Sequence, residues 1–115
     1  MKAVVAASQH WLDGDTIREC LVTLPVSATV VVSSRTGGDS LVAKIAENEM
    51  ALHVERVEVE EETFKKKMIE VISEEDVDSA YFFCLDDREP EHAISRNARA
   101  RYIPTQVIVQ SFGGV

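Results

Sequence analysis

The chain has 115 residues, of which 45% are hydrophobic, and its formal net charge is −8. The length fits one domain and the apolar content is that of a globular chain rather than a disordered one. Ten acidic and four basic residues lie between Glu55 and Asp78, so the acidity belongs to one region. Duplex nucleic acid is not expected as a partner, because its binding rests on many phosphate contacts from a basic face.

Apolar runs of strand length alternate along the chain with segments whose apolar residues recur at helical spacing. The predicted strands cover 3–7, 29–32, 53–59, 80–85 and 105–109, and the later three predicted helices cover 39–50, 61–73 and 90–101. The first helix is predicted to start at Asp15 as its N-cap and to end at Pro25. Residues 110–115 are predicted to be frayed.

This alternation of strands and helices predicts one α/β domain with a parallel sheet. Right-handed crossovers on both faces favour the strand order 3-2-1-4-5. Ligands of such sheets bind beyond the carboxyl ends of the strands, where the winding reverses, here between the first and fourth strands. Three loops are expected to converge there, namely 8–11, 33–40 and 85–88.

The junction over 30–43 carries the clearest functional signal. An apolar β-branched run ends in a small polar turn, which opens into a segment of helical spacing. Backbone N–H groups at such a helix start can meet an anion. Gly37 and Gly38 either let the backbone approach a ligand or serve a turn that needs positive φ.

Several side chains near these loops allow two interpretations each. Arg35 is either an anion partner or a solvated loop residue. Asp39 either contacts a ribose hydroxyl or caps its helix, and we favour the cap. His10 could titrate near neutrality but has no evident catalytic partner in the sequence, and Trp11 is expected to pack rather than to stack on a base.

The candidate ligand-binding residues are therefore Ser8, Gln9, His10, Ser34, Arg35, Gly37, Gly38, Asp39 and Asp86. Asp86, Asp87 and Glu89 could hold a divalent cation, although an ordinary acidic loop is the favoured interpretation. The chain has no nucleophile elbow, full Walker A motif or zinc spacing, so we predict no catalytic residue, no metal ligand and no cofactor.

Two further features concern the cellular setting. No segment approaches the roughly 20 apolar residues of a membrane span, and Met1 to Ala7 is too short for the core of a signal peptide. Cys20 and Cys84 lie far apart without C-x-x-C spacing, which favours buried free thiols. We expect a cytoplasmic protein with no membrane partner.

Two motifs resemble the SLOG superfamily, a Rossmann-like group that includes the DprA and lonely-guy families, and above all its small YspA-like and YpsA-like domains. Ala7-Ser8-Gln9-His10-Trp11 is similar to the family's first strand end, Gly-Ser-Arg followed by an aromatic residue. Ser33 to Val42 is similar to its second junction, Gly-Gly-Ala-Arg-Gly-Ala-Asp-Ser-Leu-Ala, with identity at Gly37, Asp39, Ser40 and Leu41. The resemblance implies a three-layer Rossmann-like fold and a nucleotide or nucleotide-derived ligand.

The third loop departs from the family. The family usually has Pro-Gly-Gly there, whereas this chain has Cys84-Leu85-Asp86-Asp87-Arg88-Glu89 without glycine. The phosphoribohydrolase families need that glycine-rich loop, so we predict no glycosidase activity on nucleoside monophosphates.

Three hypotheses remain open: a small binding module for a nucleotide-derived ligand, an enzyme acting on such a ligand as glycosidase or transferase, and an interaction protein that has lost the ligand. Small SLOG-like domains commonly pair, so the resemblance also implies a homodimer, with Ile94 and Tyr102 as apolar positions for the interface.

Overall fold

The computed structural model describes residues 1–74, 76–86 and 88–109. Its five strands are β1 (Lys2–Ala7), β2 (Thr29–Ser33), β3 (His53–Val57), β4 (Ser79–Cys84) and β5 (Thr105–Val109). Its helices are α1 (Gly14–Leu21), α2 (Gly38–Asn48), the short 3₁₀ helix η1 (Glu61–Thr63), α3 (Phe64–Glu74) and α4 (Pro90–Ala100). The predicted fraying of 110–115 falls outside the described residues.

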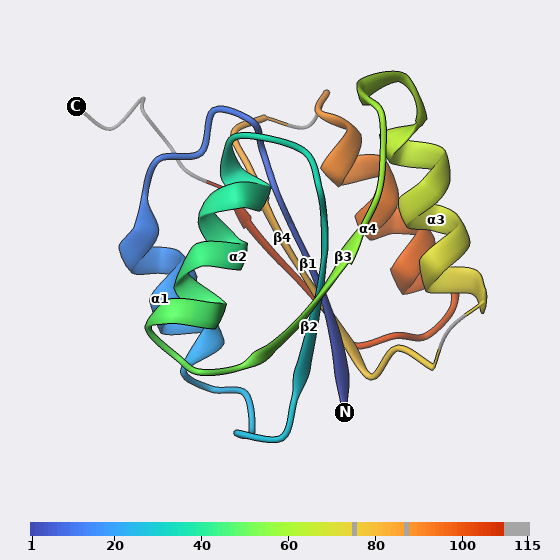
Figure 1. The fold of residues 1–115 in the computed structure, drawn as a ribbon. Helices are drawn as coiled ribbons and strands as arrows, with labels where there is room; N and C mark the ends of the chain where they lie inside the picture. The colour runs from blue at the N-terminus through green and yellow to red at the C-terminus, as the bar shows by residue number, and fades with distance from the viewer. Residues whose placement is uncertain (75, 87, 110–115) are drawn as a thin grey trace.

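All strands pair in parallel in the order β3-β2-β1-β4-β5, as predicted. Figure 1 shows α1 and α2 on one face of the sheet and α3 and α4 on the other. The predicted three-layer α/β, Rossmann-like architecture is thus confirmed. The order follows from the crossovers: two on one face, then two on the opposite face, which reverses the winding beside β1.

Each face of the sheet has its own apolar core, because strands buried on both sides send alternate side chains to opposite layers. Val5 and Val32 pack in the layer of α1 and α2. Val4 and Val31 pack in the layer of α3 and α4, together with Ile94. Ile94 is fully buried, so the expectation that it offers apolar surface to a second copy is wrong.

Two helix starts differ from the sequence prediction. The N-cap of α1 is Asp13, whose carboxylate accepts from the backbone N–H groups of Asp15 and Thr16, so Asp15 is not the cap. The predicted third helix begins as η1, where Glu60 and Thr63 form a capping box, before it continues as α3. Among the described residues no helix is long and apolar enough to cross a bilayer.

Candidate functional site

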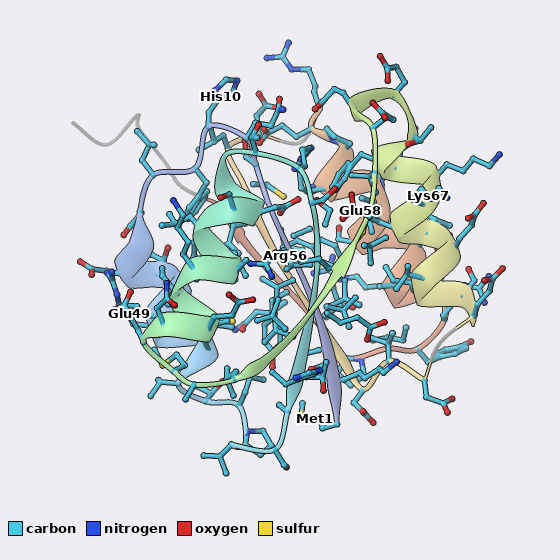
Figure 2. The ribbon with its side chains drawn as sticks, viewed as in Figure 1. Met1, His10, Glu49, Arg56, Glu58 and Lys67 are labelled. Atoms are coloured by element: carbon cyan, nitrogen blue, oxygen red, sulfur yellow. The ribbon has the colours of Figure 1, made fainter. Side chains whose placement is uncertain are left out.

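The three predicted loops meet at the carboxyl-terminal edge of the sheet, beside the switch point between β1 and β4. The N–H of Gly38 donates to the carbonyl of Ser8 at 3.1 Å, which joins the second loop to the first. The hydroxyl of Ser8 donates to Glu89 beyond β4, which joins the first loop to the third. Figure 2 shows His10 at this edge, at the end of the molecule opposite Met1.

Glycine is required where the first two loops touch. Gly37 has φ +87°, and a Cβ on it would lie 2.3 Å from the carbonyl oxygen of Gln9. A Cβ on Gly38 would lie 2.2 Å from the carbonyl oxygen of Ser8. Both distances are far inside van der Waals contact, so the close approach that these glycines permit is to their own chain. The positive φ of the second predicted interpretation is present at Gly37.

A buried charge cluster lies under these loops. The guanidinium of Arg35 forms an ion pair with Glu91 at the start of α4, donates to the carbonyl of Ala7 at 2.8 Å, and has its Nε 3.5 Å from a carboxylate oxygen of Asp39. Its central carbon lies 3.6 Å from the ring centroid of Phe64, a cation–π contact. The Arg35 side chain is therefore neither solvated nor open to a ligand in this structure.

Asp39 does not cap its helix, so the favoured interpretation is wrong. The N-cap position of α2 is Gly37, and the carboxylate of Asp39 turns inward. It accepts from the N–H of Ala7 at 2.7 Å and from the hydroxyl of Ser33. Burial raises the pKa of Asp39 to about 6, although these hydrogen bonds and Arg35 act in the opposite direction.

The Glu89 carboxylate contacts the ends of both β1 and β4, the two strands beside the switch point. One oxygen accepts from the N–H of Leu85 and, at 3.2 Å, from that of Asp86. The other accepts from Ser8, which is buried. Two adjacent backbone N–H groups and a hydroxyl form a donor set suited to an anionic oxygen group. In this structure the chain's own carboxylate takes that place.

The remaining predicted residues are spread around the edge. Gln9 donates to Glu61 at 2.8 Å, and the hydroxyl of Ser34 accepts from the N–H of Val59 at 3.0 Å. His10 is exposed, and Asp86 is exposed with a carboxylate that accepts from the N–H of Arg88 at 2.8 Å. Trp11 is buried edge-on to a Phe83 ring, as its packing interpretation predicted.

Glu91 was not among the predicted residues. Its side chain is 1% exposed, and one of its carboxylate oxygens has no hydrogen-bond partner within the described residues. The sequence held a signal for it. Glu91 precedes Ile94 and Ala98 by three and seven positions, and so falls on the buried stripe of α4.

The site offers carboxylates but no evident metal centre. Within the described ranges no three His, Cys, Asp or Glu side chains are grouped so that they could hold a metal ion. Asp87, one of the three residues considered for a cation, lies outside these ranges. A comparison with protein-family models and with curated proteins finds no match to this chain.

Proposed function

We propose that this protein is a small binding module for a nucleotide or nucleotide-derived ligand, held at the carboxyl ends of β1 and β4. The observation that carries the proposal is the donor set of Ser8 and the N–H groups of Leu85 and Asp86, now occupied by Glu89. It lies at the switch point, where α/β sheets of this kind bind their ligands.

The buried cluster beneath supports the same proposal. Arg35, Asp39 and Glu91 are withdrawn from water, and such burial of charge is costly even when the charges pair. Burial raises the pKa of Asp39 to about 6, and ionisable groups with shifted pKa values occur preferentially at functional sites. The cluster ties the start of α2 to the start of α4, and so holds the two loops that flank Ser8.

A ligand must displace the Glu89 side chain to use these donors. Glu89 belongs to the loop before α4 and is only half-buried, so its movement leaves the core intact. The carboxylates of Glu89 and Asp86 then face the ligand, and they suit hydroxyl groups such as those of a ribose. We also propose that the chain belongs to the SLOG superfamily, and that resemblance implies the same ligand class.

A second candidate is an interaction protein without a ligand. The specific observation in its favour is that side chains of the chain itself occupy the edge: Glu89 on Ser8, and Glu91 on Arg35. In either case we propose a homodimer located in the cytoplasm.

The test is a thermal-shift and NMR titration with adenosine, AMP, ADP-ribose and a cyclic dinucleotide. A ligand of the folded state raises stability, by about 2.7 kcal/mol at a hundredfold excess over Kd. We expect amide shifts at 8–10, 35–39 and 85–89. Shifts that instead map to the hollow of about 280 Å³ lined by Ser79, Tyr81, Pro104, Thr105 and Gln106 would refute this site. Absence of any shift would favour the interaction protein.

Two histidines provide a matched pair for this titration. His10 is exposed at the carboxyl-terminal edge, and His53 is exposed at the amino end of β3. We expect His10→Ala to weaken the binding of a ligand at the proposed edge. His53→Ala should leave it unchanged, and equal effects of both variants would argue against the proposed location.

A further inference from the structure

The last turn of α4 ends in an unfavourable backbone conformation. Tyr102 has φ +61°, in the left-handed region that bulky side chains rarely adopt. Its N–H donates to the carbonyl of Arg99, and the N–H of Ile103 donates to that of Ala98. This is the Schellman pattern, whose left-handed position is usually glycine.

The side chain of Tyr102 is not packed against the rest of the fold. The residue is 94% exposed, more than any other large hydrophobic residue among those described. A tyrosine that is both strained and unpacked contributes no stability through its ring. The left-handed conformation serves to end the helix and would suit glycine, so the presence of an exposed tyrosine there needs another explanation, and a binding role supplies one.

Three arginines precede this tyrosine closely in the sequence. Arg96, Arg99 and Arg101 are exposed and form no ion pair within residues 1–74, 76–86 and 88–109. The other arginines each pair with at least one carboxylate: Arg18, Arg35, Arg56 and Arg88. From His92 to Val109 the chain has no acidic residue, although its net charge is −8.

Figure 1 shows that α4 runs away from the carboxyl-terminal edge, so this basic end lies apart from the site proposed above. Acidic residues approach the same end of the molecule from the segment after α3. Asp78 is already engaged, because its carboxylate accepts from the N–H of Lys2 at 2.8 Å. Within the described residues neither Asp78 nor Glu74 nor Asp76 forms an ion pair with these arginines, which are exposed to an outside partner.

We propose that Arg96, Arg99, Arg101 and Tyr102 form a docking surface for an acidic segment of another protein. Arginine and tyrosine are enriched among the residues that dominate protein–protein binding. Charge complementarity selects an acidic partner. A nucleic acid would need a larger basic face than three arginines, since its binding rests on many phosphate contacts.

The test uses a short peptide of glutamates with one central leucine, titrated into the labelled protein and followed by NMR. We expect shifts confined to 96–103 that weaken as salt rises. Replacing the three arginines with alanine should lower the affinity by about tenfold or more. Replacing Lys65, Lys66 and Lys67, three exposed cations on α3, should leave it unchanged.

Tyr102→Gly separates a binding role from a structural one. Glycine suits the left-handed position, so the variant should melt at the same or a higher temperature, yet bind the peptide more weakly. Ala51→Gly is the matched control. Ala51 follows α2 with φ +53°, and its replacement should raise the melting temperature without any effect on peptide binding.

Three outcomes would overturn the proposal: no shifts at 96–103, an equal loss of affinity in the lysine variant, or unchanged binding by Tyr102→Gly. A thymidine oligonucleotide supplies the remaining comparison. If it binds this end more tightly than the peptide, the surface recognises nucleic acid and the proposal is wrong.

Discussion

Arg35 and Glu91, which are 56 positions apart in the chain, form an ion pair whose side chains are only 4% and 1% exposed. Arg35 follows β2 and Glu91 lies in the first turn of α4, so the pair connects loops on the two sides of the switch point. Removing one charge from such a pair leaves the other buried and uncompensated.

We therefore expect Arg35→Met to lower the free energy of unfolding by about 3–5 kcal/mol, measured by urea denaturation. Arg56→Met is the control, because Arg56 pairs with Glu47 at 2.6 Å on the exposed surface. Exposed pairs contribute about 1 kcal/mol or less. Similar losses in both variants would show that the buried cluster contributes no more to the free energy of unfolding than an exposed ion pair does.

Asp39 should make stability depend on pH in an unusual direction. Burial raises its pKa from 3.8 to about 6, so between these values the folded state binds more protons than the unfolded state. The contribution of Asp39 is then fully present below pH 3.8 and is lost as the pH rises through about 6. The loss corresponds to about 3 kcal/mol at most.

The measurement is urea denaturation of the protein and of Asp39→Asn from pH 4 to pH 8. The unfolding free energy of the unmodified protein, relative to that of Asp39→Asn, should fall as the pH rises to about 6 and should stay constant above that pH. A difference that is constant over this range would mean that Asp39 titrates alike in both states.

Gly38→Ala should destabilise the protein, because its Cβ would meet the Ser8 carbonyl oxygen at 2.2 Å and the Ala7 side chain at 2.7 Å. We expect a loss of about 1–3 kcal/mol, as for overpacking elsewhere. Gly14→Ala is the control: its nearest contact is the flexible end of Arg18 at 3.2 Å, and alanine is the better helix former. Thermal unfolding of both variants tests this, and tolerance of Gly38→Ala would contradict the loop packing.

Both cysteines should resist alkylation. Burial raises the pKa of Cys20 and of Cys84 to about 12, and nearby carboxylates add to the effect at Cys84. Because the thiolate is the reacting species, we expect slow modification by iodoacetamide at pH 8 in the folded state and prompt modification in urea. Prompt reaction of the folded protein would show that one thiol is accessible.

The element order, the parallel sheet and its strand order could all be predicted from the amino-acid sequence. These follow from hydrophobic periodicity and crossover handedness, which depend on residues near one another in the chain. The sequence also located the three loops, because strand ends on the same side of a parallel sheet must converge. Helix boundaries shifted by a few residues: Asp13 rather than Asp15 caps α1, and α1 ends at Leu21 rather than at Pro25.

The roles of the loop residues could not be predicted in this way, because they depend on contacts between segments far apart in the chain. The capping role favoured for Asp39 was wrong because Ala7 and Ser33, on two other elements, offer hydrogen bonds that a helix end does not. Arg35 became a buried residue because α4 brings Glu91 to it. The distances between such partners are set by the packing of whole layers, and the strength of their interactions by the exclusion of water, and neither is encoded by neighbouring residues in the chain.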